Sequence, residues 1–525
     1  MKPAWILTCI VGVCLAASLT AFAESGPNYT TRVYPGPDGR LVYAPDSLGN
    51  IIPDFSNAGY MGGGVMLPIV PNKVTLWGVE GDATPIIQAA IDSVSAMPAD
   101  ANGFRGAVLL RAGYYELDGT LTINTHGVVL RGAGQDELGT ILFARGNTRR
   151  NTLIQVSGTE RPAVDSTTVK RITDDYVPVG ARTFTVENAR GYKVGDTIYV
   201  RRYGNAEWIT FIGMDEKRWR PFTIPYDRII TAIDGNKITV DAPIMCAIET
   251  KWGGGDIIKY SAPGRVTKVG IENLRGISDF NQDVRRSEYG NIDRQPYIAE
   301  PYYADESHCW NFIVIDNATN CWVRDITGLH FGNSLVNVTG NGSRVTVQDC
   351  TSLAPVSQRA GGRRFTYRLE GQLTLVQRCK ADQGRHNFIL GDPHAVGPNV
   401  FLECTATRQY ATSEPHTQWA TGGLYDSVKA QLTARYWDFS IGWSGANMVF
   451  WNCEGDFRIQ QPPTAQNFTF GHIGINASII NYDLQDQTKP EGYMESLDRH
   501  VTPASLYLKQ LEDRLGPQAV ENIAW

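Results

Sequence analysis

Three of the eight histidines fall in one stretch of the chain, residues 384–419. His386 follows Arg385, whereas His394 and His416 each follow a proline. Histidine titrates near neutral pH, so it can accept or donate a proton in catalysis. A lone histidine in a turn is usually only a hydrogen-bonded surface residue, but three beside many arginines favour a catalytic cluster.

The same region is locally basic. The whole chain has a net charge of −6, yet in residues 359–386 only Glu370 and Asp382 oppose seven basic residues. These are Arg359, Arg363, Arg364, Arg368, Arg378, Lys380 and Arg385. Guanidinium groups bind carboxylates through paired hydrogen bonds, so the patch predicts a uronic-acid or sulfated sugar as ligand. The alternative is that the arginines only cover outer strands.

These residue types suit β-elimination on a polysaccharide that contains uronic acid. Cations must neutralise the charge that develops on the carboxylate, a base must take the C5 proton, and an acid must protonate the leaving oxygen. We expect Arg368 and Arg385 to neutralise the uronate, His386 to act as the base, and His416 or Tyr367 to act as the acid. Aromatic rings stack on sugar faces. Further substrate contacts are expected from Arg364, Lys380, Arg408 and Trp419.

Two other functions fit the same region. Hydrolysis by paired carboxylates is the first alternative. The available carboxylates are Asp382, Asp392, Glu414, Asp426, Asp438, Glu454 and Asp456. A non-catalytic glycan-binding solenoid is the second alternative, although uneven loops rich in histidine and arginine favour an enzyme. No loop has the clustered oxygen ligands that calcium prefers, so we expect no required metal or cofactor, with Ca2+ as the alternative.

A repeat in the second half of the chain indicates the scaffold. Five similar segments end in Ile326, Cys350, Cys379, Cys404 and Cys453, at intervals of 24, 29, 25 and 49 residues. A period in the twenties is typical of a β-solenoid, in which equivalent residues of successive coils stack on one another. We expect a buried, reduced cysteine ladder rather than disulfides, because stacked side chains that point the same way have poor disulfide geometry.

The front of the chain resembles a known superfamily. Residues 81–92 (GDATPIIQAAID) predict a capping helix, with Thr84 as N-cap, Pro85 in its first turn, and Ile87 and Ile91 on the buried face. GAVLLRAGYYEL and HGVVLRGAG then read as short strands broken by glycine. Together the three motifs resemble the pectate-lyase-like superfamily, which includes polysaccharide lyases, glycoside hydrolases, epimerases and phage tailspikes. The resemblance implies an all-β, right-handed parallel β-helix that binds polysaccharide along its outer face.

We divide the chain into a signal peptide (1–23), an N-terminal extension (24–75), a β-helix (76–480) and a C-terminal tail with a helix (481–525). Hairpin signals indicate a β subdomain inserted into the β-helix at about 180–246. This insertion is either a wall of the substrate cleft or a decoration.

The first residues predict export. Lys2 precedes an apolar stretch, and Ala21-Phe22-Ala23 is a small-x-small cleavage site, so we expect cleavage after Ala23 and a secreted or periplasmic protein. No later stretch has the apolar length of a membrane span. The net charge of −6 gives no attraction to nucleic acid or anionic membranes. The expected partner is an acidic polysaccharide, and we expect a monomer.

Overall fold

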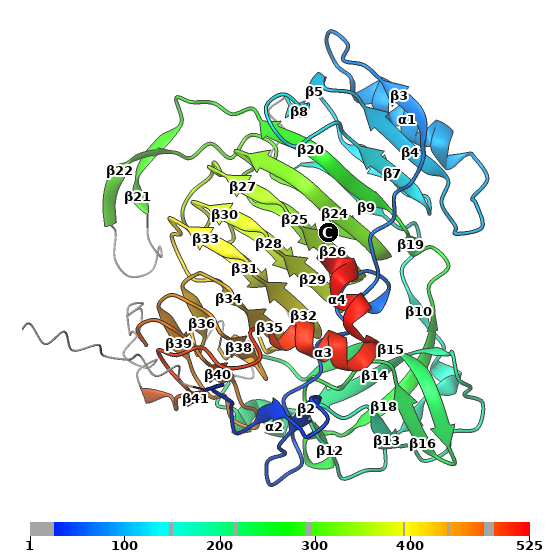
Figure 1. Cartoon of the computed structure of the whole chain (residues 1–525), viewed down its shortest axis with the longest axis vertical. Coiled ribbons are helices and arrows are strands. Elements are labelled where there is room, and N and C mark those ends of the chain that lie inside the picture. The colour runs from blue at the N-terminus through cyan, green and yellow to red at the C-terminus, as the bar shows by residue number, and fades with distance from the viewer. Residues whose placement is uncertain are drawn as a thin grey trace, which may run out of the picture.

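The computed structural model describes residues 26–145, 151–214, 219–289, 297–391, 394–437, 442–476 and 488–524, so the predicted signal peptide lies outside the described residues. The chain winds into stacked coils whose short strands form parallel sheets (Figure 1). The fold is a right-handed parallel β-helix, as the resemblance implies. Within the described residues, no helix has the length and apolar character needed to cross a membrane.

The coils have three faces. The first face contains β3 (Asn72–Leu76), β4 (Gly106–Leu110), β7 (Val128–Arg131), β20 (Gly270–Ser278), β24 (Ala318–Leu329), β26 (Ser343–Gln348), β29 (Thr374–Gln377), β32 (Val396–Leu402), β35 (Ala420–Asp426), β38 (Val449–Trp451), β40 (Phe468–Phe470) and β41 (Tyr493–Glu495). The second face contains the ends of β20 and β24 with β5 (Gly113–Leu117), β8 (Thr140–Ala144), β27 (Thr351–Leu353), β30 (Lys380–Asp382) and β33 (Thr405–Thr407).

The third face contains β6 (Leu121–Ile123), β9 (Thr152–Ser157), β23 (Asn311–Asp316), β25 (Ser334–Val338), β28 (Phe365–Leu369), β31 (His386–Leu390) and β34 (Glu414–Pro415). It continues toward the C-terminal end through β36 (Leu432–Ala434) and β39 (Phe457–Ile459). Because the strands of each face pair in parallel register, residues one coil apart lie about 4.8 Å from each other.

The predicted cysteine ladder is confirmed. Cys350, Cys379, Cys404 and Cys453 are fully buried, and Ile326 occupies the same position one coil earlier. The residue before each ladder position has a left-handed backbone, with φ of 54° at Asp325, 55° at Asp349, 51° at Arg378, 51° at Glu403 and 50° at Asn452. These residues form a sharp corner between the first and second faces rather than part of a flat strand, and this corner turns each ladder residue inward.

All seven cysteines of the described chain are free thiols in the structure. Burial disfavours the reactive thiolate. We therefore expect a thiol reagent to label none of the seven in the folded protein and all seven after denaturation without reductant. Mass spectrometry after each treatment measures this, and a labelling count that rises only when reductant is added would contradict the reduced ladder.

A short helix closes the N-terminal end of the solenoid. Helix α1 (Thr84–Ser95) buries Ile87, Ala90, Ile91 and Val94, the face that the sequence predicted. The N-cap is Ala83 rather than Thr84, whose hydroxyl instead donates to Asp82 Oδ1 at 2.6 Å.

The N-terminal extension and the C-terminal helices meet on the outside of the first face. Helices α3 (Leu506–Leu515) and α4 (Pro517–Ile523) lie across its strands (Figure 1). The Tyr507 hydroxyl donates to the Ala58 carbonyl at 2.7 Å, and Gln510 Nε2 donates to the Pro53 carbonyl at 2.9 Å. On β29, Gln377 Nε2 donates to the last residue of α4. This part of the first face is therefore covered by the chain itself.

A buried carboxyl group holds the start of α3. Asp426 Oδ2 on β35 accepts hydrogen bonds from Ser505 Oγ at 2.7 Å and from the Tyr507 backbone N–H at 2.8 Å. Burial raises the pKa of Asp426 to about 7. An acid whose pKa is higher in the folded state than in the unfolded state stabilises the fold at low pH, and this stability is lost as pH rises through the folded pKa.

We expect Asp426→Asn to remove this pH dependence. The wild type should lose up to about 4 kcal/mol of stability from this group between pH 4 and pH 8, because each pKa unit is worth about 1.4 kcal/mol. Asparagine keeps an acceptor oxygen but cannot ionise. Thermal unfolding at pH 5 and pH 8 tests this, and parallel melting curves for the two proteins across that range would contradict it.

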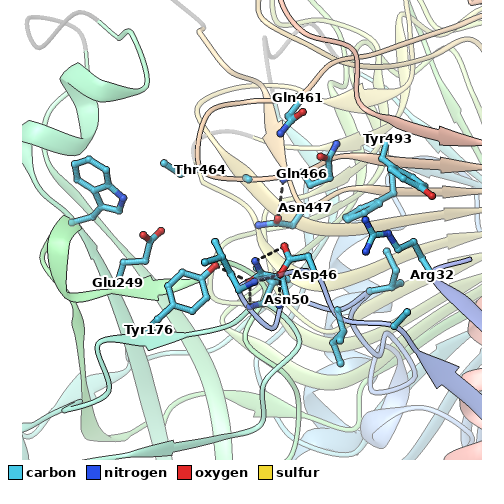
Figure 2. Close-up of a pocket in the computed structure, with 18 of the residues that line it drawn as sticks. Arg32, Asp46, Asn50, Tyr176, Glu249, Asn447, Gln461, Thr464, Gln466 and Tyr493 are labelled. Carbon is cyan, nitrogen blue, oxygen red and sulfur yellow. Dashed lines mark hydrogen bonds between the residues drawn. The ribbon is translucent and has the colours of Figure 1, made fainter.

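The insertion is larger than the predicted range of 180–246. Its antiparallel sheet contains β10 (Ala163–Val164), β13 (Thr183–Thr185), β14 (Thr197–Gly204), β15 (Phe222–Asp234), β16 (Lys237–Val240) and β18 (Gly255–Ser261), and α2 (Ala206–Phe211) follows β14. The insertion, the last coils and the N-terminal extension with its hairpin β1 (Val33–Pro35) and β2 (Leu41–Tyr43) surround a cavity (Figure 2).

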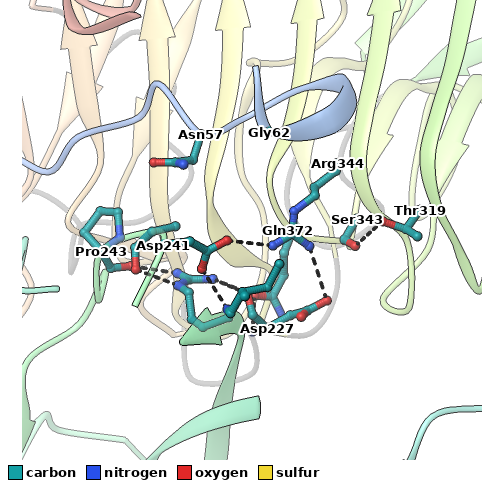
Figure 3. Close-up of polar contacts among 12 residues, drawn as sticks. Asn57, Gly62, Asp227, Asp241, Pro243, Thr319, Ser343, Arg344 and Gln372 are labelled. Atoms are coloured by element: carbon teal, nitrogen blue, oxygen red, sulfur yellow. Dashed lines mark hydrogen bonds and ion pairs between the residues drawn. The ribbon is translucent and has the colours of Figure 1, made fainter. Parts of the chain in front are cut away.

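Buried ion pairs fix the insertion to the solenoid (Figure 3). Asp227 of the insertion is 2% exposed and accepts from Tyr260 Oη at 2.6 Å and Arg265 Nη1 at 3.0 Å. Arg344 of the solenoid donates to Asp241 at 2.9 Å and lies 4.0 Å from Asp227. Burial alone would raise the pKa of Asp227, but Arg344 and Arg265 outweigh it and lower this pKa. The insertion is therefore held in one orientation against the solenoid, beside β26 of the first face.

Candidate active site

The candidate site lies on the outer side of the third face. Arg368 on β28 pairs with Ile389 on β31, and Ile389 pairs with Glu414 on β34. Because side chains alternate along a strand, these residues point away from the core, whereas the neighbouring Tyr367 and Phe388 are core residues.

One aromatic ring brings four of the predicted catalytic residues together. The ring of Phe365, which is 3% exposed, lies 5.2 Å from the His386 ring and 5.1 Å from the His416 ring. The guanidinium carbons of Arg368 and Arg385 lie 5.5 Å and 5.9 Å from it. The geometry is consistent with the sequence prediction that these four residues share a site, and their roles remain a prediction.

A buried carboxylate organises the two histidines. Glu414 Oε1 accepts a hydrogen bond from His416 Nδ1 at 2.7 Å and lies 3.2 Å from His386 Nδ1. Glu414 Oε2 accepts from the hydroxyls of Thr412 and Thr433, each at 2.7 Å. Glu414 is fully buried, so its charge depends on these partners.

The electrostatics of this cluster follow from burial and from neighbouring charge. Burial alone would raise the pKa of Glu414, but the two histidines, together with Arg435, lower it to about 2. Burial lowers the pKa of His386 well below its ordinary value. Glu414 is therefore ionised near pH 7.

The hydrogen bonds fix where the protons lie. His386 Nδ1 donates to the Thr412 carbonyl at 2.6 Å, because a carbonyl oxygen can only accept. His416 Nδ1 donates to the Glu414 carboxylate for the same reason, which leaves its Nε2 as an acceptor in the neutral ring. The His416 side chain is 10% exposed and that of His386 is fully buried. His416 is therefore the better placed of the two to take a proton from a substrate.

Three ligand atoms in this cluster are close enough to hold a metal ion. One atom each from His386, Glu414 and His416 lies within 4.8 Å of the others. Both Nδ1 atoms carry protons directed at protein acceptors, so a metal ion could bind the two histidines only through their Nε2 atoms while these hydrogen bonds exist. The same hydrogen bonds also fit a carboxylate–histidine pair that positions a base.

Two of the predicted site residues lie where a substrate cannot reach them. Tyr367 is fully buried in the solenoid core, and its hydroxyl donates to the carbonyls of Cys350 at 2.8 Å and Lys380 at 2.9 Å. Trp419 is fully buried and packs edge-on against Trp208 of the insertion at 4.8 Å. The expectation that Tyr367 is the acid and Trp419 a sugar platform conflicts with this burial.

The remaining predicted substrate-binding residues lie outside the cluster. Arg364 is 2% exposed and donates to the Ser357 carbonyl at 2.7 Å, and burial lowers its pKa to about 9. Lys380 lies on the second face. Arg408 pairs with Asp382 near the corner that follows the second face. Arg364 therefore stabilises a loop and does not face a substrate. His394 stacks on Phe222 of the insertion, with the ring centroids 3.8 Å apart.

The carboxylates considered for hydrolysis are dispersed. Asp426 lies under α3, Asp382 pairs with Arg408, and Glu454 lies 3.1 Å from Lys429. Asp392 and Asp438 lie outside the described residues. Asp426, Asp382 and Glu454 therefore bind other partners and do not pair with Glu414.

The sequence analysis did not predict several residues of the cluster. Phe365, Thr412, Thr433 and Arg435 carried no signal of their own, and Glu414 was considered only as a hydrolytic carboxylate. The sequence did contain one signal for the Glu414–His416 pair, because the two residues are two positions apart. In a strand this spacing places both side chains on the same face.

Known proteins resemble this chain in structure but not in sequence. No family model matches the chain, and no curated protein matches it. Among solved structures, it is similar to the tailspike protein gp49 from Pseudomonas phage LKA1, with 12% identity, a TM-score of 0.42, and coverage of 74% of this chain and 56% of that one. The chain thus spans little more than half the length of that tailspike.

Two enzymes are also similar in structure. They are the polygalacturonase from Erwinia carotovora ssp. carotovora, with 10% identity, a TM-score of 0.34 and coverage of 78% of this chain and 79% of that one, and pectate lyase Pel9A, with 10% identity, a TM-score of 0.37 and coverage of 83% and 79%. At these identities the likeness concerns the fold alone.

We expect Glu414→Gln to reduce stability near pH 7 by about 3 kcal/mol. The folded pKa of about 2 lies below the unfolded value, so the stability from Glu414 is present above about pH 4.5 and is lost as pH falls toward 2. Urea unfolding of both proteins from pH 7 to pH 3 should show the difference shrinking with acidification. A difference that stays constant with pH would contradict an ionised Glu414.

Proposed function

We propose that this protein is a secreted or periplasmic polysaccharide lyase that cleaves a uronic-acid-containing chain by β-elimination. The observation that carries the proposal is the Glu414–His416 pair beside two arginines around Phe365, on the outer side of the third face. A carboxylate that holds a histidine by Nδ1 leaves Nε2 directed as a base.

His416 replaces His386 as the proposed base. Its Nε2 removes the C5 proton of the uronate while the C4–O4 bond breaks and the C4=C5 double bond forms. The His416 imidazolium then donates this proton to the departing O4 oxygen. His416 therefore also acts as the acid, in place of Tyr367. Glu414 stabilises the imidazolium, because opposite charges attract strongly in a buried setting.

Arg368 and Arg385 are proposed to bind the uronate carboxylate and to neutralise the charge that develops there. In the structure Arg368 pairs with Glu370 at 2.5 Å, and Arg385 donates to the Gly361 carbonyl. A substrate carboxylate would compete for these guanidinium groups. The proposed role of His386 is to pack against His416, at a ring separation of 4.7 Å, and to fix its orientation.

The outward row of the third face suggests how an extended chain lies. Asn337, Arg368, Ile389 and Glu414 stack at one residue per coil. A polysaccharide parallel to the solenoid axis would cross this row in turn. Paired-carboxylate hydrolysis is the alternative activity, and glycan binding without turnover is the second alternative.

The test is a panel of pectate, rhamnogalacturonan, alginate, glucuronan and glycosaminoglycans, with ultraviolet absorbance and reducing ends measured together. We expect both the absorbance and the reducing ends to rise on at least one substrate, because elimination creates an unsaturated product.

EDTA should leave the rate unchanged. His416→Asn should lower kcat at least 100-fold, whereas the matched control His500→Asn, at an exposed histidine outside the cluster, should not.

Reducing ends without absorbance would overturn elimination and favour hydrolysis. Full activity in His416→Asn would overturn the proposed base, and binding without any product would favour the non-catalytic alternative.

A further inference from the structure

A cavity of about 530 Å3 lies where three distant parts of the chain meet (Figure 2). Its walls come from the N-terminal extension (32–52), the insertion (176–252) and the last coils (447–493). None of its lining residues belongs to the cluster around Phe365 and Glu414. We propose that this cavity is a second glycan-binding site that takes an uncharged sugar unit, and this proposal does not depend on the elimination reaction.

The first argument is the aromatic lining. Tyr176 comes from the insertion side and Tyr493 from the last coils (Figure 2). Trp252 of the insertion also lines the cavity. Phe211 also lines the cavity and is 56% exposed. Tyr176 is held in place, since its hydroxyl donates to Asn50 Oδ1 at 2.9 Å. The C–H faces of a sugar ring pack well against fixed aromatic rings.

The second argument is the type of polar group between the rings. Asn50, Asn447, Gln461 and Gln466 each line the cavity, and Figure 2 shows all four around its interior. A primary amide presents a donor and an acceptor together, which matches a sugar hydroxyl that both donates and accepts. The Asn50 amide is already used by Tyr176 and Asp46, and Gln466 Nε2 donates to the Asn467 carbonyl. This match therefore rests on the Gln461 amide and the Gln466 amide oxygen. Asn447 is fixed by donation to the Met245 carbonyl at 2.9 Å, so part of this polar lining is preformed.

The third argument is charge. Arg32 and Lys251 are balanced by Asp46 and Glu249 in the lining. Lys251 Nζ lies 4.3 Å from the Trp252 ring, and Arg32 lies 5.2 Å from the Tyr493 ring. The Asp46 carboxylate is used by its own loop, because it accepts from the backbone N–H groups of residues 48 and 50 at 2.8 and 2.9 Å. The cavity thus lacks the cationic excess of the Phe365 cluster.

Size agrees with this assignment. Small-molecule sites are commonly about 300–1,000 Å3 and mix an apolar lining with a few directed polar groups. A cavity of about 530 Å3 falls inside this range. A neutral sugar branch or terminal sugar of an acidic polysaccharide could occupy the cavity while the acidic main chain of the polysaccharide lies on the third face.

The test uses the full chain with the His416→Asn change, which prevents turnover. Trisaccharides of galactose, glucose, mannose, rhamnose and xylose serve as probes in saturation-transfer NMR, and the best binder is then measured by calorimetry. We expect at least one to bind. Binding should weaken at least tenfold in the Gln461→Ala/Gln466→Ala double variant and in Phe211→Ala, whose changed side chains are partly exposed.

Gln518→Ala, an exposed glutamine on α4, is the matched control and should bind as the parent does. Thermal unfolding confirms that each variant is folded. Failure of all five trisaccharides to bind at 10 mM would overturn the proposal, and so would unchanged affinity in both cavity variants. Failure of the elimination assay alone would overturn only the lyase function.

Discussion

The solenoid and the candidate site depend on the parallel register between successive coils. Backbone hydrogen bonds hold neighbouring strands about 4.8 Å apart, so a residue at one position contacts its equivalent in the next coil. Cys350, Cys379 and Cys404 therefore share one buried environment, and Asp349, Arg378 and Glu403 share one corner. The same register places Arg368 and Glu414 in one outward row, although the connections between their strands differ in length.

The three faces are used differently because other parts of the chain cover them differently. The N-terminal extension and the C-terminal helices cover the first face, where Trp451 Nε1 donates to the Pro503 carbonyl at 2.8 Å. The insertion is anchored by Asp227 and Arg344 and buries Trp419 at the edge of the third face. On the third face, Arg368 and His416 are partly exposed, whereas Ile389 and Glu414 of the outward row are fully buried. An extended ligand could therefore reach the cluster only through its partly exposed members.

The sequence predicted most of the fold and only part of the site. The ladder was visible because stacked positions repeat the same residue type, and the helix at 84–95 was visible through its apolar spacing. Tyr367 and Arg368 are adjacent, yet one points to the core and the other to solvent. Local composition near a strand end does not predict which of the two side chains points to the core.

Other parts of the site depend on long-range packing. Trp419 follows a polar loop in sequence but packs on Trp208, which lies in the insertion. Thr433 on β36 reaches Glu414 from the next coil, whereas Thr412 lies only two residues before Glu414. Such contacts depend on coil geometry, which residue types alone do not encode. The insertion extended beyond its predicted limits for the same reason, because only its central hairpins carry turn signals.

The most direct test of the central claim is a crystal structure of His416→Asn with an uncleaved uronate hexasaccharide. The account predicts a chain along the outer row of the third face, with one C5 atom about 3 Å from the residue 416 side chain. The carboxylate of the same sugar should contact Arg368 or Arg385. A hexasaccharide bound to the second face, or only in the cavity beside Trp252, would contradict the proposed site.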